Sequence, residues 1–194
     1  MKKIVLLLTF LTFMVGYSQE NVVVDATQTP SFKRNELRLN AAALIAGVFE
    51  LSYERVLNQE FGAGASIYIA GSTANPEGNY QSFSFTPYFR SYFGKKPAAG
   101  FFFEGFGMYN VTNTYIYKYN YDYYGNYSFG DSYVKGEKVS DFALGFGLGG
   151  KWMTRKGVIF ELSAGIGRNL FNEKNNTIGT KIVGRGALSV GYRF

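Results

Sequence analysis

Apolar and polar residues alternate along the final stretch of the chain, from Ile182 to Phe194. Its even positions carry apolar, aromatic or glycine residues, whereas its odd positions carry small or cationic residues that include Arg185 and Arg193. A period of two residues indicates a β-strand with two chemically different faces. Transmembrane barrels are built from strands of about 9 to 11 residues, with aromatic residues near both membrane surfaces. We therefore expect this stretch to be the last strand of such a barrel.

The same alternation recurs seven times before the final stretch, and turn-forming residues separate the repeats. The predicted strands are 35–45, 49–56, 62–69, 82–90, one from 101 to beyond 111, its return through 142–149, 158–166 and 182–194. Turns after the second, fourth and sixth strands are short, whereas longer loops follow the third, fifth and seventh, as in outer-membrane barrels. The sequence thus predicts an all-β fold: an eight-stranded antiparallel up-and-down transmembrane barrel with a filled polar lumen. Pro87 lies inside the fourth strand, so we expect a lost ladder bond or a bulge there.

The amino-terminal segment has the features of a secretory signal peptide. Lys2 and Lys3 precede an apolar run from Ile4 to Val15, and small residues follow. This run is too short for a transmembrane helix, which needs about 20 residues. We expect 1–18 to be the signal peptide, 19–34 a short periplasmic segment and 35–194 the outer-membrane barrel, with both chain ends in the periplasm.

Charged residues fall on the inward face when the alternation is extended through every strand. An isolated buried charge is costly, so an enclosed lumen requires acids and bases in balance. Eight strands leave room only for side chains, and we expect no open pore: the charges form ion pairs that hold the barrel closed, with a gated ion path as the alternative. The predicted lumen charge network is Glu36, Arg38, Glu50, Glu54, Arg90, Glu104, Lys151, Glu161, Arg185 and Arg193.

The amino-acid composition argues against most kinds of catalytic site. The chain has neither cysteine nor histidine, so it lacks the ordinary nucleophile–base pairs and zinc ligands, and we expect no catalytic residue, cofactor or metal. Gly145–Gly150 resembles a dinucleotide loop but lies within a strand, without a helix after it. The adjacent acids Glu50 and Glu54 face the lumen, where a structural role is favoured over catalysis on lipid. A dispersed net charge of +6 does not indicate a nucleic-acid surface.

A tyrosine-rich segment follows the fifth strand. Its residues favour a hairpin that projects beyond the membrane, because Tyr, Asn, Gly and Ser are the residues of many binding loops. Two readings remain open, namely a β-hairpin that touches lipopolysaccharide or nothing, and a specific site for a protein or a glycan. The candidate binding residues are Tyr115, Tyr117, Tyr119, Tyr121, Tyr123, Tyr124 and Tyr127.

The chain resembles the small OmpA/OmpX-type eight-stranded barrels of the Gram-negative cell envelope. Asn35–Asn40, Glu50–Arg55 and the glycine-rich third strand are similar, more narrowly, to a family of uncharacterised outer-membrane barrels, over about residues 33 to 194. Unlike in full-length OmpA, we expect no periplasmic peptidoglycan-binding domain after the barrel, so we do not expect wall anchoring. The chain end resembles the signal that the barrel assembly machinery recognises: Leu188, Val190, Tyr192 and Phe194.

These observations lead to an expected function. We expect a non-enzymatic outer-membrane barrel with a structural, adhesive or partner-docking role through its extracellular loops. The alternative is a small channel or transporter with a gated polar lumen. The expected partners are outer-membrane lipid and lipopolysaccharide, the assembly machinery during biogenesis, and a protein or glycan at the loops.

Overall fold

The computed structural model describes residues 33–71, 80–118, 132–171 and 181–194. The predicted signal peptide, most of the predicted periplasmic segment and the centres of three predicted loops lie outside these residues. The described elements, in chain order, are β1 (Asn35–Asn40), α2 (Ala41–Ile45), β2 (Val48–Val56), β3 (Phe61–Ala70), β4 (Tyr80–Tyr92), β5 (Gly100–Lys118), β6 (Ser132–Met153), β7 (Val158–Asn169) and β8 (Ile182–Arg193).

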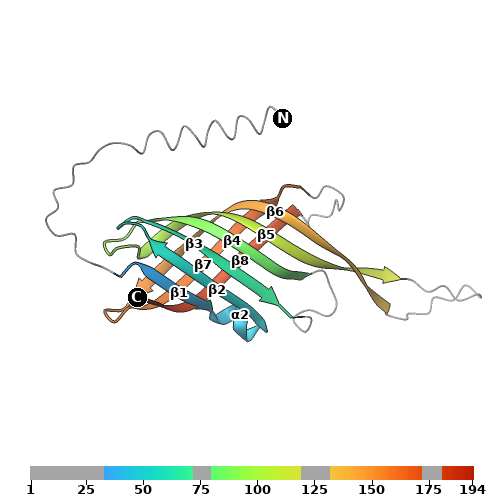
Figure 1. Ribbon diagram of the computed structural model, residues 1–194, viewed down its shortest axis with the longest axis horizontal. Coiled ribbons are helices and arrows are strands. Elements are labelled where there is room, and N and C mark those ends of the chain that lie inside the picture. Colours follow the sequence, from blue (N-terminus) through green and yellow to red (C-terminus); the bar gives the residue numbers. More distant parts are fainter. Residues whose placement is uncertain (1–32, 72–79, 119–131, 172–180) are drawn as a thin grey trace, which may run out of the picture. The chain divides into compact units, whose positions relative to one another are not determined.

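The strands form a closed antiparallel barrel in which each strand pairs with its neighbours in sequence. The barrel closes where β1 pairs with β8, with Leu39 opposite Val190. Figure 1 shows the strands crossing the barrel obliquely, and the carboxy-terminus beside the start of β1. The predicted eight-stranded up-and-down topology is confirmed. None of the helices in the described residues is long and apolar enough to cross a membrane.

The first strand is shorter than predicted. The sequence favoured one strand over 35–45, but β1 ends at Asn40 and residues 41–45 form the helical turn α2. The Asn40 side chain caps this turn by accepting a hydrogen bond of 3.2 Å from the Ala43 amide. Alanine has the highest helix propensity and gives no contrast between two faces of a strand. The apparent alternation through Ala41–Ile45 therefore carried no information.

Pro87 leaves a local gap in the ladder between β4 and β5. No pairs are formed at Thr86 and Pro87, yet the pairing of Phe85 with Tyr109 and of Tyr88 with Phe106 keeps one register across the gap. The shift in register between these strands lies instead between Gln81 and Phe83. The proline thus costs ladder bonds, as predicted, and causes no bulge.

The two faces of the barrel differ in chemistry. Glutamates, arginines and one lysine are buried inside, whereas large apolar and aromatic side chains are exposed outside. The exposed set covers every strand: Leu37, Phe49, Tyr53, Ile67, Ile69, Phe85, Phe89, Phe101, Phe103, Tyr109, Leu144, Phe146, Leu148, Trp152, Phe160, Leu162, Ile166, Leu188, Val190 and Tyr192. The barrel therefore has the opposite polarity to that of a water-soluble protein.

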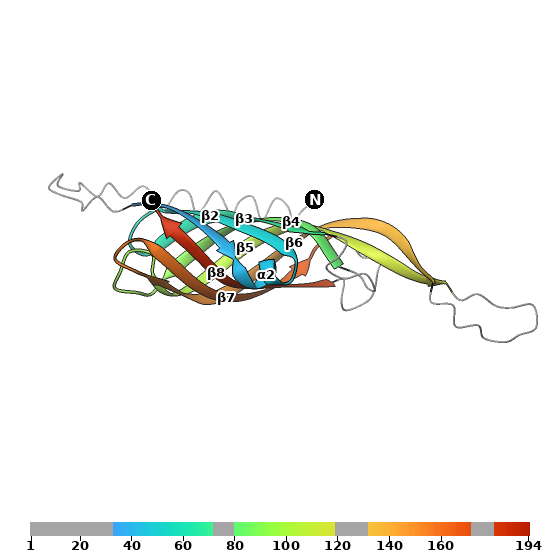
Figure 2. The same cartoon turned by 90° about the horizontal axis from the view of Figure 1, so that it is seen from below.

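The two ends of the barrel also differ. One end, called the short-turn end here, carries the connections 57–60, 93–99 and 154–157 together with the carboxy-terminus. The other, called the long-loop end, carries α2 and the connections from β3, β5 and β7 to the strands that follow them. There β5 and β6 remain paired as far as Lys118 and Ser132. Figures 1 and 2 show this pair of strands extending well beyond the rest of the barrel.

Candidate functional site

The structure brings the ten charged residues of the predicted network together inside the barrel. Nine of them are at most 8% exposed, and the side chain of Arg185 is 15% exposed. They come from all strands except β3, because inward positions of neighbouring strands share one lumen. Five carboxylates face five cations, so the charge of these ten residues is balanced and each ion has a partner of opposite sign.

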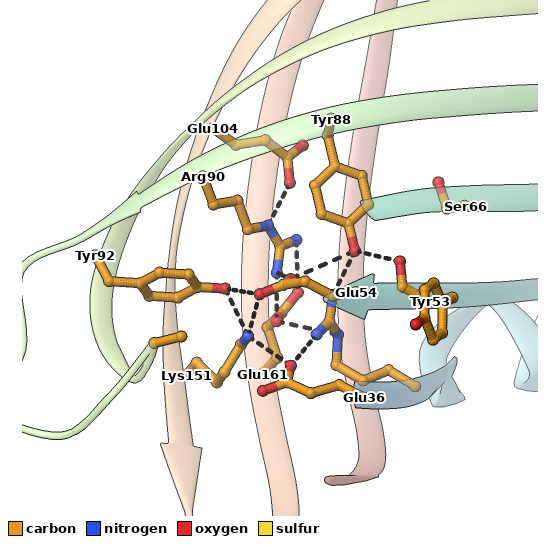
Figure 3. Close-up of polar contacts among 12 residues, drawn as sticks. Glu36, Tyr53, Glu54, Ser66, Tyr88, Arg90, Tyr92, Glu104, Lys151 and Glu161 are labelled. Carbon is orange, nitrogen blue, oxygen red and sulfur yellow. Dashed lines mark hydrogen bonds and ion pairs between the residues drawn. The ribbon is translucent and has the colours of Figure 1, made fainter. Parts of the chain in front are cut away.

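Glu54 is the centre of this network and is fully buried. One carboxylate oxygen, Oε1, accepts hydrogen bonds from Lys151 Nζ at 2.9 Å and the Tyr92 hydroxyl at 2.5 Å. The other, Oε2, accepts from Arg38 at 2.9 Å and from Arg90 at 3.0 Å. Figure 3 shows the side chains of Lys151, Tyr92 and Arg90 converging on Glu54. A single carboxylate therefore connects three cations, and its loss would leave an excess positive charge in the lumen.

Arg90 extends the network across the lumen. Its guanidinium donates two hydrogen bonds to Glu161 on β7, at 2.8 and 3.0 Å, and one of 2.7 Å to Glu104 on β5. The same group lies 4.2 Å from the ring centre of Phe102. A bidentate carboxylate pair and an aromatic surface both fix the orientation of a guanidinium. Arg90 thus connects β4 to its neighbour β5 and, across the lumen, to β7.

The turn between β4 and β5 closes the lumen at the short-turn end. Arg193 donates to Glu36 at 2.7 Å and to the backbone oxygens of Pro97 and Ala98 at 2.8 and 2.9 Å. Ala98 is fully buried, and its amide donates to the Gln59 oxygen. The left-handed conformations at Ala98 (φ 44°) and Gly100 (φ 100°) let the turn fold inward. Sequence reasoning treated this segment only as a turn.

An apolar layer lies between the charged network and the long-loop end. Tyr88, Phe106, Met108, Ala143 and Val183 form one buried cluster. Inward side chains beyond it are again polar and buried, among them Asn110 and Asp141. The lumen is therefore filled in layers, and water does not reach the central charges, which are 0–2% exposed at Glu54, Lys151 and Arg38.

Several network members were not among the predicted site residues. Tyr88 accepts a hydrogen bond of 2.7 Å from Arg38, Tyr92 bonds both Glu54 and Lys151, and Asn40 donates to Glu50 at 2.7 Å. Ser66 accepts from Arg185 at 3.2 Å. All four occupy inward positions, so the alternation that located the charges contained the signal for them as well.

Glycines make room for large inward side chains, most of which are aromatic. A Cβ atom at Gly64 would lie 2.6 Å from the Tyr88 hydroxyl oxygen, and one at Gly167 would lie 3.2 Å from a Phe106 ring carbon. At Gly165 the neighbours are both Phe106 and Arg185. The inward glycines thus shape the lumen around Tyr88 and Phe106 more than around arginines.

We expect Tyr92→Phe to lower the free energy of unfolding by about 1–3 kcal/mol, because it leaves buried polar groups of Glu54 and Lys151 without one partner each. Tyr109→Phe is the matched control, since Tyr109 is exposed on the outer face. Its expected effect is below about 0.5 kcal/mol. Denaturant unfolding followed by the fluorescence of the single tryptophan, Trp152, measures both. Equal effects of the two variants would contradict a network that depends on the Tyr92 hydroxyl.

The residues of the predicted assembly signal lie outside the lumen. Leu188, Val190, Tyr192 and Phe194 are exposed on the outer face of β8 and its end, beside the seam with β1. Of the tyrosine-rich hairpin, Tyr115 and Tyr117 belong to β5, and Tyr119, Tyr121, Tyr123, Tyr124 and Tyr127 lie outside the described residues. The structure therefore joins the charged residues into one site and leaves the assembly-signal residues on the outer face.

The contacts of the network join the strands of the barrel to one another. Both oxygens of Glu54 accept from several donors, so neither is free to accept a proton from a substrate. In the residues that the structure describes, no three carboxylates gather in a way that could hold a metal ion. The structural role of Glu50 and Glu54 stays a prediction.

The comparisons with known proteins support the fold. No protein-family model matches the chain, and no curated protein matches it in sequence. The N-terminal β-barrel domain of Pseudomonas aeruginosa OprF, a crystal structure, superposes with a TM-score of 0.51 over 84% of this chain and 98% of that domain, at 14% sequence identity. At this level of identity the likeness concerns the fold, and the chain shares the OmpA-like eight-stranded barrel architecture with that domain.

Proposed function

We propose that this protein is a non-enzymatic integral outer-membrane barrel with a non-conducting lumen, which serves a structural, adhesive or docking role at its long-loop end. The observation that carries the proposal is the inverted polarity of the barrel. Charged side chains such as Glu54 and Lys151 are fully buried, whereas leucine, isoleucine, valine and aromatic side chains cover the outside.

The apolar outer face of the barrel is more stable in contact with lipid hydrocarbon than in contact with water. Soluble monomers seldom expose a continuous apolar patch above about 600 Å², yet the outer face is apolar around every strand. In lipid the same face needs no cover, and a closed barrel leaves no unpaired strand edge. The likeness in fold to the OprF barrel domain supports the same location.

Cell fractionation and heating test the membrane location. The protein should sediment with outer membranes, resist extraction by alkaline carbonate and migrate faster in unheated than in heated detergent gels, because a closed barrel stays compact in the detergent. Recovery in the soluble periplasm, or identical mobility before and after heating, would contradict the proposal. The signal peptide is tested in the same cells by amino-terminal sequencing of the mature chain.

The filled lumen predicts an electrically silent protein. The charges at the centre are paired, and the layer of Tyr88, Phe106 and Met108 covers them toward the long-loop end. Planar bilayers that contain the folded barrel should show no reproducible conductance steps. Steps that disappear in Arg90→Met, with unchanged heat-dependent mobility, would favour the alternative of a small channel.

The extended strands β5 and β6 are the part best placed to meet a partner. Their pairing reaches Lys118 and Ser132, beyond the other strands (Figure 1). Replacing residues 119–131 by a short glycine-rich turn should leave folding and heat-dependent mobility unchanged but remove the product of photo-crosslinking from position 115 in intact cells. An unchanged crosslinked product would contradict a docking role for this hairpin.

A further inference from the structure

A groove crosses the outer face of β5, β6 and β7 close to the short-turn end. It has a volume of about 510 Å³, and its lining includes Phe101, Leu148, Gly150, Trp152, Leu162 and Ala164. Gly150 lies opposite Phe101 on one neighbouring strand and Leu162 on the other. Gly150 has no side chain, and the ring of Trp152 lies over it, since a Cβ atom at Gly150 would be 2.9 Å from that ring. The lining of the groove is almost entirely apolar.

The groove opens at one end onto a basic hollow. This second space, of about 270 Å³, shares Gly100 and Trp152 with the groove and is also lined by Lys95 and Lys96 of the turn between β4 and β5. Both lysines are exposed, and neither has an ion-pair partner among the described residues. Two lysines without an ion-pair partner among the described residues therefore lie at one end of the apolar groove.

The surroundings of the hollow are basic as well. Exposed charged side chains of the described short-turn end comprise seven cations and the single acid Glu60; the cations are Lys33, Arg34, Arg55, Lys95, Lys96, Arg155 and Lys156. In a membrane this end would lie at the headgroup level of one leaflet. Basic side chains at that level attract anionic lipids.

We propose that the groove and the hollow together bind one anionic phospholipid, with an acyl chain along the groove and its phosphate at Lys95 and Lys96. This inference rests on the proposed membrane location. An apolar groove on the outer face fits a flexible hydrocarbon chain, and free ammonium groups at its end complement a phosphate. A zwitterionic lipid could fill the same groove, but it would gain less from the basic surroundings.

Native mass spectrometry of the barrel in a nonionic detergent tests the proposal. The protein is titrated with phosphatidylglycerol or with phosphatidylcholine of the same acyl chains. The wild-type protein should bind phosphatidylglycerol more tightly. Lys95→Glu combined with Lys96→Glu should weaken that binding at least about tenfold, since each cation near an anionic headgroup contributes about a factor of five, and should leave phosphatidylcholine binding unchanged.

A second variant tests the groove. Ala164→Phe should weaken binding of both lipids, because the new ring fills the space of the acyl chain. The matched controls are Lys138→Glu with Arg168→Glu at the long-loop end, and Gly184→Phe on the outer face of β8, where a Cβ atom meets nothing within 4 Å. Neither control should change binding.

Three results would overturn the lipid site: equal affinity of the wild type for the two lipids, equal losses in the test and control variants, or a dimer of the chain that covers the groove. Heat-dependent mobility is measured on every variant. If any of these results is found while the gel mobility still depends on heating, only the proposed lipid site is contradicted. If the gel mobility of the wild-type protein does not depend on heating, the proposed membrane location is contradicted as well.

Discussion

Glu54→Gln is expected to lower the free energy of unfolding by about 3–5 kcal/mol, the usual cost of removing one partner from a buried ion pair. The neutral amide is similar in size, so the lumen keeps its volume. Lys151, Arg38 and Arg90 lose their shared anion, and the enclosed charge becomes positive. Urea unfolding in phosphatidylcholine vesicles, followed by the mobility of the folded form in gels, measures the change.

A compensating variant separates charge from packing. Glu54→Gln combined with Lys151→Met restores the balance of charge, and it should recover part of the loss because no excess cation remains. The double-mutant cycle then gives a coupling energy of at least about 1 kcal/mol. Strictly additive effects of the two substitutions would show that the ions of the lumen act independently.

Ile67→Arg is expected to destabilise the barrel by about 2–4 kcal/mol in a bilayer, because a guanidinium near the middle of the lipid-facing surface loses its hydration. Ile67 lies near the middle of β3, is 40% exposed and pairs with Leu51 and Phe85. Unfolding in lipid vesicles measures the effect. The sign of the change in the free energy of unfolding is informative, since an added surface charge would be harmless or favourable if water surrounded this face.

Leu57→Arg is the control for depth. Leu57 is exposed at the short-turn end, directly after β2, where an arginine reaches the aqueous boundary and should cost about 0–1 kcal/mol. Similar costs at Ile67 and Leu57, or a stabilising effect of Ile67→Arg, would be incompatible with a bilayer around the barrel.

The sequence predicts the strands well because each inward residue differs in polarity from its outward neighbours. That contrast exists in β2 through β8, and there the predicted strands correspond to observed ones. It is absent in Ala41–Ile45, where three alanines precede leucine and isoleucine, and there the prediction of a strand is wrong. The period is informative only where the two faces meet different environments.

Position within the lumen could be predicted, but the contacts could not. Alternation places Arg90 and Glu161 inside. Only the closure of the sheet, however, brings Arg90 on β4 within hydrogen-bond distance of Glu161 on β7, which lies 71 residues later in the chain. Tyr92 was missed because the predicted fourth strand ends at residue 90, whereas β4 continues to Tyr92, whose hydroxyl binds Glu54. The oxygens of Pro97 and Ala98 that Arg193 binds belong to the backbone, which any residue supplies.

Ion pairs that span the barrel have a consequence for how the chain reaches its final form. Glu36, near the start of β1, meets Lys151 115 residues later and Arg193 157 residues later. A partly built sheet holds these ions without their counterions, so it gains little from them. These ion pairs form only when the last strand is in place, which favours a cooperative folding transition without stable intermediates. Truncation before Arg193 should therefore leave an incomplete sheet that envelope proteases degrade.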